Sequence, residues 1–76
     1  MARPTREIRK AIVRNLTEAR EARMFEDFDR CWTLLEDAHV LSQPWAWLHV
    51  RVHGSMFVAA IMQRDVREVW GQLSKF

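Results

Sequence analysis

Glycine, proline and cysteine are all scarce in this 76-residue chain, which contains two glycines, two prolines and one cysteine. With the single Cys31, the chain can form neither an internal disulfide nor a cysteine-based zinc site, so nothing in it suggests secretion. The N-terminal residues lack the apolar core of a signal peptide, and the longest apolar run, residues 56–62, is far too short to span a bilayer. We therefore expect a cytoplasmic protein without a membrane partner.

The scarcity of helix-breaking residues, and the lack of any sustained period-two alternation, predict an all-α fold. The length is sufficient for a single small domain over residues 1–76. Four helices are expected at about 6–23, 27–41, 44–62 and 65–75, with Thr5 as the first N-cap and Pro44 as the first residue of the third helix. Asp65 and Glu68 resemble a capping box and predict the start of the fourth. Because the connections are short, we expect two antiparallel helix–turn–helix hairpins.

Each expected helix has an apolar stripe at helical spacing, which predicts the core. Cys31 falls within the second stripe, so we expect a small buried side chain rather than a reactive thiol. The stripes are Ile8, Ile12, Leu16 and Ala19; Phe28, Cys31, Trp32, Leu35 and Ala38; Trp45, Leu48, Val52, Met56 and Ala59; and Val66, Val69, Trp70 and Leu73.

A weak internal repeat relates the second and fourth expected helices. The pattern D-F-x-x-C-W-x-x-L at 27–35 matches D-V-x-x-V-W-x-x-L at 65–73, an offset of 38 residues that lies near the periods of helical-repeat proteins. The equivalent Trp32 and Trp70 are therefore expected in the core. The first unit resembles a tetratricopeptide repeat in its second helix, which implies stacked helical hairpins.

The third expected helix has a second apolar stripe on another side. It consists of Trp47, Val50, Gly54, Phe57 and Ile61. A helix that is apolar nearly all round is normally buried, and a chain this small covers both sides only if this helix is central or if one side meets another subunit. Gly54 would let a neighbouring backbone approach closely. We therefore expect a homodimer or another homo-oligomer.

All three histidines fall near the turn between the second and third expected helices. His49 and His53 are four residues apart and so project from one side of a helix, while antiparallel packing would bring His39 towards them. With Glu36 and Gln43 they form a candidate polar cluster. Three imidazoles and a carboxylate suit a divalent metal ion such as zinc. The favoured interpretation is nevertheless that the histidines are satisfied by one another, by backbone carbonyls at the end of the second helix, or by Glu36, so no cofactor is firmly expected.

Charge is distributed unevenly along the chain. Residues 1–23 contain seven Lys/Arg and three Glu, whereas residues 24–40 contain one Arg and five Asp/Glu. Such segments can complement each other within one fold or across a dimer. A nucleic-acid surface on the first helix is disfavoured, because its arginines alternate with Glu7, Glu18 and Glu21.

Three spaced patterns resemble an uncharacterised bacterial family, domain of unknown function 3703. They are A-H-x-L-x-Q at 38–43, H-x-x-x-H-x-x-M at 49–56 and R-D-x-x-E-x-x-G-Q at 64–72. The resemblance implies that His39, Gln43, His49, His53 and Gln72 belong to one constellation. Relatives usually have glycine near the first turn and at the position of Ser42, and a further tail beyond Phe76. The resemblance implies no activity.

These patterns do not determine a function. The favoured hypothesis is a non-enzymatic protein-interaction or self-assembly module with an unknown protein partner. The first alternative is a divalent-metal-binding protein, or less favoured a metalloenzyme, that uses His39, His49 and His53. An enzyme is the minor hypothesis because no nucleophile, phosphate-binding loop or carboxylate pair accompanies the histidines. Nucleic-acid binding is the weakest alternative.

Overall fold

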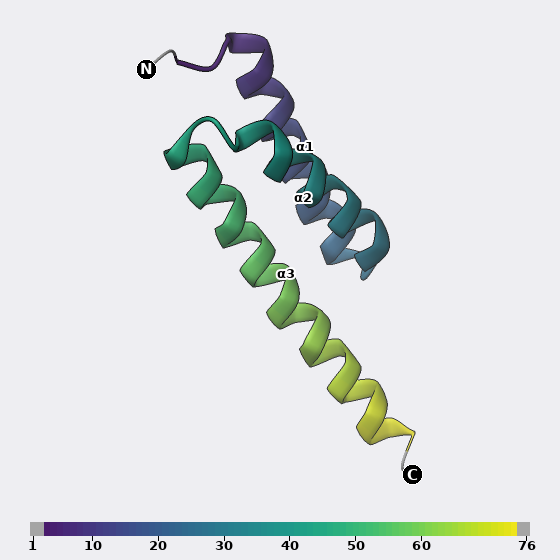
Figure 1. Cartoon of the computed structure of the whole chain (residues 1–76). Coiled ribbons are helices and arrows are strands. Elements are labelled where there is room, and N and C mark those ends of the chain that lie inside the picture. Colours follow the sequence, from purple (N-terminus) through teal and green to yellow (C-terminus); the bar gives the residue numbers. More distant parts are fainter. Residues whose placement is uncertain (1–2, 75–76) are drawn as a thin grey trace.

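The computed structural model describes residues 3–74 and consists of three helices, α1 (Arg6–Met24), α2 (Phe28–Ser42) and α3 (Ala46–Leu73). The helices α1 and α2 form an antiparallel hairpin, and α3 runs back along it and continues past its end (Figure 1). No strand occurs within residues 3–74, so the all-α prediction is confirmed.

Short polar side chains fix the starts of the first two helices. Thr5 is the N-cap of α1, as predicted, and its Oγ1 accepts a hydrogen bond of 3.1 Å from the Ile8 N–H. Asp27 caps α2 in the same way, with Oδ1 accepting from the Arg30 N–H at 3.2 Å, so it precedes the helix rather than opening it.

The helix α3 begins two residues later than predicted. Pro44 lies in the turn, because the Trp45 N–H donates to the Ser42 carbonyl at 2.9 Å and closes that turn. Trp45 keeps an extended backbone and is the N-cap, which makes Ala46 the first helical residue.

The turn between α1 and α2 is a Schellman motif without glycine. The Asp27 N–H donates to the Ala22 carbonyl at 2.8 Å, and the Glu26 N–H donates to the Arg23 carbonyl at 3.0 Å. This pattern places Glu26 in the left-handed region with φ of 61°. Glycine is the residue best suited to that conformation, and the family resemblance implies a glycine in this region.

The predicted third and fourth helices are one helix, so the prediction of four helices in two hairpins is wrong. Neither glycine nor proline lies between Gly54 and Gly71 to interrupt it. The capping-box residues Asp65 and Glu68 instead lie inside α3, where Arg64 Nε donates to Glu68 Oε1 at 3.1 Å across one turn. The repeat at 65–73 is therefore the end of a long helix and does not form a second hairpin.

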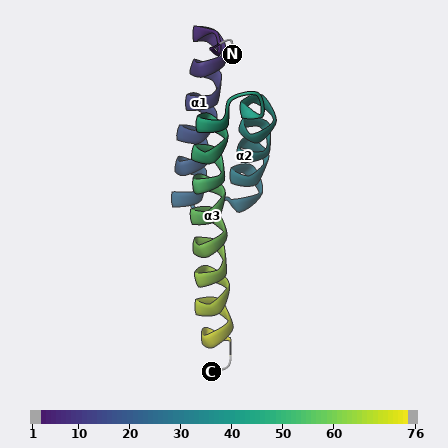
Figure 2. The same ribbon diagram turned by 60° about the vertical axis from the view of Figure 1, so that its left-hand side comes forward.

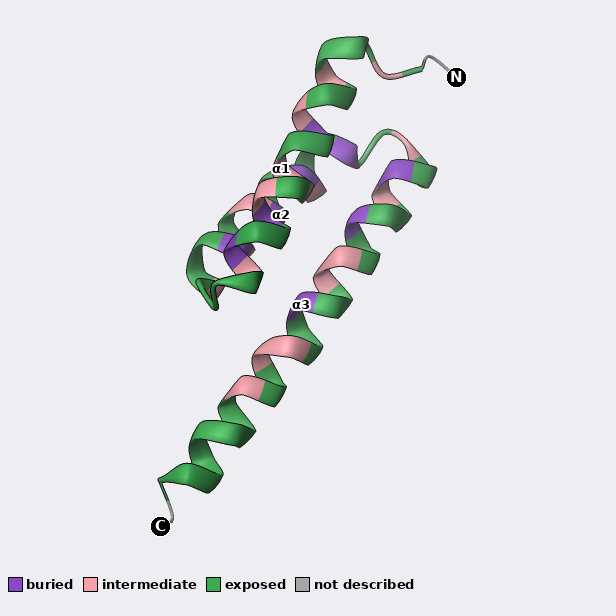
Figure 3. Cartoon of the chain, turned by 180° about the vertical axis from the view of Figure 1, so that it is seen from behind, coloured by how far each residue is buried: buried purple, intermediate pink, exposed green. Residues whose placement is uncertain are grey.

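The core lies between the three helices and follows the first three predicted stripes. All three helices contribute buried residues (Figure 3). Ile12, Leu35 and Val52 are the largest fully buried side chains among the described residues. Cys31 is 1% exposed, which agrees with its predicted role as a small buried side chain. Burial raises the pKa of its thiol above the ordinary value, so the thiol is neutral.

The predicted fourth stripe is not a core stripe. Val69, Trp70 and Leu73 are exposed, because α3 extends beyond the hairpin and nothing in the described chain covers its last turns (Figure 2). Trp32 is half-buried, and its Nε1–H donates to Gln63 Oε1 at 2.9 Å. Trp32 and Trp70 therefore differ in environment, and the prediction of a core position for Trp70 is wrong.

Few charged contacts link the basic and acidic segments. Arg30 of α2 lies 3.9 Å from Glu18 of α1, and both side chains are largely exposed. Such a pair contributes little to stability. Among the described helices none is both long enough and apolar enough to cross a membrane.

Candidate metal centre

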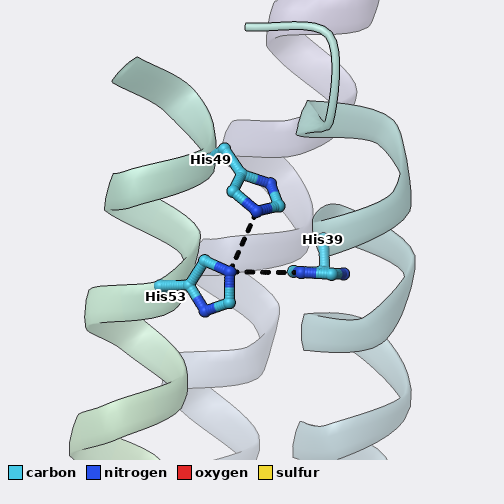
Figure 4. A group of neighbouring side chains, drawn as sticks. All are labelled: His39, His49 and His53. Atoms are coloured by element: carbon cyan, nitrogen blue, oxygen red, sulfur yellow. Dashed lines mark hydrogen bonds between the residues drawn. The ribbon is translucent and has the colours of Figure 1, made fainter. Parts of the chain in front are cut away.

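The three histidines meet where the last turn of α2 faces the first two turns of α3 (Figure 4). His49 and His53 project from one side of α3, as their four-residue spacing predicts. The tight turn at 43–45 returns the chain antiparallel to α2 and brings His39 opposite them. Sequence proximity and helix packing thus produce the cluster together.

The facing atoms of the three rings are the Nε2 nitrogens. His53 Nε2 lies 2.9 Å from His49 Nε2 and 3.2 Å from His39 Nε2. The ring centroids are 4.5–4.8 Å apart, and the rings are tilted or edge-on rather than stacked. This arrangement brings one ring nitrogen of His39 and one of His49 close to His53 Nε2 instead of maximising ring contact.

Hydrogen bonding alone satisfies this cluster poorly. An imidazole nitrogen has either one N–H or one in-plane lone pair. His53 Nε2 therefore cannot form two well-directed hydrogen bonds, one to His39 and one to His49, at the same time. The predicted self-satisfied cluster leaves one short N···N contact without a good hydrogen bond.

A metal ion resolves this conflict, because all three lone pairs can then be used. Metal–nitrogen bonds of about 2.0–2.1 Å place tetrahedral ligand atoms about 3.3 Å apart and neighbouring octahedral ligand atoms about 3.0 Å apart. The two closest Nε2···Nε2 distances, 2.9 and 3.2 Å, are similar to both values. All three residues together offer ligand atoms within 4.8 Å of one another.

Electrostatics favours the neutral, ligand-competent form of His49. Desolvation lowers its pKa below the ordinary value of 6.5, and the neighbouring His53 and His39 lower the pKa further. The His49 Nδ1 is also buried and has no hydrogen-bond partner within residues 3–74. His53, by contrast, is exposed, so the cluster opens to solvent on that side.

The remaining predicted members of the polar cluster lie outside the histidine triad. Glu36 and Gln43 are exposed, and neither makes a hydrogen bond or ion pair with the three histidines. Gln72 lies 19 residues beyond His53 on the same helix, a separation of about 28 Å at 1.5 Å per residue. Within one chain, the single constellation implied by the resemblance is therefore reduced to the histidines.

Ser42 contacts the histidine triad through the backbone of His39, a role that the sequence patterns did not reveal. Its side chain is 0% exposed, and Oγ donates to the His39 carbonyl at 3.1 Å. This bond fixes the last turn of α2 just where His39 projects. The signal in the sequence was the small residue next to the turn, where the family resemblance implies a glycine.

Comparison with known families gives one match. The sequence model of the family described as "Protein of unknown function (DUF3703)" covers residues 6–76. The chain belongs to this family. The expected resemblance is thereby confirmed, and membership of DUF3703 brings no established function. No curated protein and no solved structure matches the chain.

Proposed function

We propose that this DUF3703 protein binds a late first-row divalent transition-metal ion through Nε2 of His39, His49 and His53. The observation that carries the proposal is the grouping of three imidazoles whose candidate ligand atoms lie within 4.8 Å of one another. Three imidazoles form a neutral, nitrogen-only ligand set, which suits zinc, copper and nickel better than calcium or magnesium.

The open side of the triad gives the ion at least one further coordination position. Three protein ligands with an open position allow water or an incoming ligand to complete the coordination sphere. No carboxylate of residues 3–74 hydrogen-bonds to the histidines, so general acid–base chemistry has no evident partner. Binding is therefore the function we propose, in preference to catalysis.

A bound ion would also join α2 to α3. The end of α3 near the triad follows a short turn, and its opposite half extends free of the hairpin. Small domains have limited cores and gain stability from metal clips of this kind. We expect metal binding and stability of the α2–α3 packing to rise together.

Isothermal titration of metal-free protein with zinc, copper and nickel tests this proposal. We expect one ion per chain. Single His39→Ala, His49→Ala and His53→Ala substitutions should each weaken affinity more than about a hundredfold, since loss of even an outer-shell partner reduces affinity 10–100-fold. The matched control is Glu36→Gln, which alters the predicted carboxylate member of the cluster and should leave affinity unchanged.

The outcomes separate the alternatives. Absence of binding by all three metals would refute the proposal and leave the histidines as internally bonded residues. Binding that survives His53→Ala would place the ion elsewhere. A strong effect of Glu36→Gln would show that the ligand set includes a carboxylate.

The exposed second stripe of α3 supports a second candidate function, self-association. Trp47 is 83% exposed and Phe57 is 67% exposed, and Val50 and Ile61 are also exposed. With Gly54 these residues are spaced alternately three and four apart, which is the spacing of a coiled-coil seam. A Cβ added at Gly54 would have no neighbour within 4 Å, so a second helix has room to approach there.

We propose a second copy of this chain as the occupant of that seam. An isologous pair of α3 helices buries the same five positions on both sides. Sedimentation over a range of protein concentrations should show a dimer, and Phe57→Glu should shift it to monomer. The control is Val40→Glu, at an exposed apolar position on α2, and it should not shift the dimer to monomer. A monomer at every concentration would refute this candidate.

A further inference from the structure

We propose that the groove between α1 and α3 binds a small organic oxyanion, a carboxylate or a phosphate monoester with a short apolar body. The groove is separate from the histidine triad, and the proposal does not depend on metal binding.

The groove is a real cavity of the fold. Its volume is about 240 Å³, which is somewhat below the usual range of about 300–1,000 Å³ for drug-sized ligands. Side chains of α1 and α3 form its walls, and Cys31 and Leu35 of α2 also line it. It therefore suits a compact ligand.

Three arginines line this cavity: Arg20 and Arg23 from α1 and Arg51 from α3. No carboxylate of residues 3–74 lies within 4.0 Å of any of their guanidinium nitrogens, and the nearby Glu18 lies instead beside Arg30. Arginine remains protonated at all relevant pH values. Three arginines, of which Arg20 and Arg51 are exposed and Arg23 is half-buried, thus bring positive charge to one small groove and favour an anion there.

Arg23 has an unmet hydrogen-bonding capacity. Its Nε is buried, and it has no hydrogen-bond partner in the described chain. Buried donors normally have a partner, because an unsatisfied one is unfavourable. A guanidinium donates through a planar fork that matches the two oxygens of a carboxylate or phosphate. An oxyanion in the groove would supply the missing acceptor once the Arg23 side chain turns its Nε towards the groove.

The other residues that line the groove indicate the chemistry of the uncharged part of the ligand. Val13, Leu16 and Ala59 give the cavity apolar walls, while Thr17 and Ser55 add hydroxyl groups. The Cys31 thiol is neutral because burial raises its pKa, so it does not act as an internal counterion. A charged head with a small apolar body fits this mixture better than a bare inorganic ion.

Titration with phenyl phosphate, benzoate and benzyl alcohol tests the proposal. The three probes share a ring and differ in the charged group. The titrations use the full chain at constant ionic strength with EDTA present, so that no metal ion can bind the anions. We expect phenyl phosphate or benzoate to bind at least tenfold more tightly than benzyl alcohol. The anion that binds more tightly identifies the charged head group of the ligand. Changes in amide NMR shifts should locate the bound anion beside Ala19 and Ala59.

Arginine variants provide the decisive comparison. Arg23→Gln and Arg51→Gln should each weaken the favoured anion at least tenfold, whereas Arg67→Gln, at an exposed position on the end of α3, should not. Arg51→Gln decides the matter if Arg23→Gln fails to fold. Three results would each overturn the proposal. They are a failure of both anions to bind below about 10 mM, an equal loss of anion affinity in the Arg67→Gln variant, and binding of benzyl alcohol as tight as that of the anions.

Discussion

Acidification should largely abolish the stabilisation that zinc binding at the proposed site would give to this protein. At a free zinc concentration 100-fold above the dissociation constant, binding to the folded state adds about 2.7 kcal/mol to the free energy of unfolding. For a domain of 60–100 residues each kcal/mol raises the melting temperature by about 4–8 °C. At pH 7.5 the melting temperature should therefore rise by roughly 10–20 °C.

Protons compete with zinc for the same three Nε2 atoms. A metal ion binds the neutral form of imidazole, so the affinity of a site built from histidines falls as the pH is lowered from 7.5 to 5.5. The lowered pKa of His49 reduces its share of this effect. At pH 5.5 the same zinc concentration should therefore occupy the site much less, and the shift in melting temperature should be much smaller.

The comparison is made at each pH between zinc and EDTA, because the metal-free protein also responds to acid. The pKa of His49 is lower in the folded state than in the unfolded state. The unfolded chain therefore takes up the proton first, near pH 6.5, and stability present above that pH decreases as the pH falls. Differential scanning fluorimetry records both effects.

Three results would refute this reasoning. A zinc-dependent shift of equal size at pH 5.5 and 7.5 would exclude imidazole ligands, and an equal shift in the His49→Ala/His53→Ala double variant would exclude this site. No shift at pH 7.5 with zinc in large excess would exclude specific zinc binding.

Two further predictions concern the packing that positions the triad. Glu26→Gly should stabilise the protein by about 0.5–1 kcal/mol in urea unfolding, because it relieves the left-handed conformation of the turn, and a loss of stability would contradict the Schellman geometry. Gln63→Ala should destabilise it by about 1 kcal/mol by leaving the Trp32 indole N–H without its acceptor, and Trp32→Phe should make that substitution nearly neutral. An unchanged effect of Gln63→Ala in the Trp32→Phe background would argue against this hydrogen bond.

Much of the architecture follows from local patterns in the sequence. The first two helices were predicted within about one residue at each end, because Thr5 and Asp27 are strong caps and the apolar residues recur at helical spacing. The core positions Ile12, Leu35 and Val52 follow from the same spacing. The pairing of His49 with His53 on one side of α3 needs only four-residue spacing.

The sequence patterns predicted two helices where the structure has the single helix α3. The reason is that the acidic residues of a capping box also occur within helices, where they pair with neighbouring side chains. Asp65 and Glu68 satisfy either interpretation, and no local residue decides between them. The extension of α3 beyond the hairpin decided the exposure of Val69, Trp70 and Leu73, since burial depends on what lies opposite a stripe.

The candidate sites also depend partly on local sequence patterns and partly on how the helices pack. The sequence by itself determined the extent of the first two helices, which stripes are apolar and that two histidines share a face, because these depend on contacts within one or two turns. Only the tertiary structure brought His39 to His49 and His53, left Glu36 and Gln43 outside, and gathered Arg20, Arg23 and Arg51 around one cavity. Those contacts join different helices, and their geometry depends on how the helices pack.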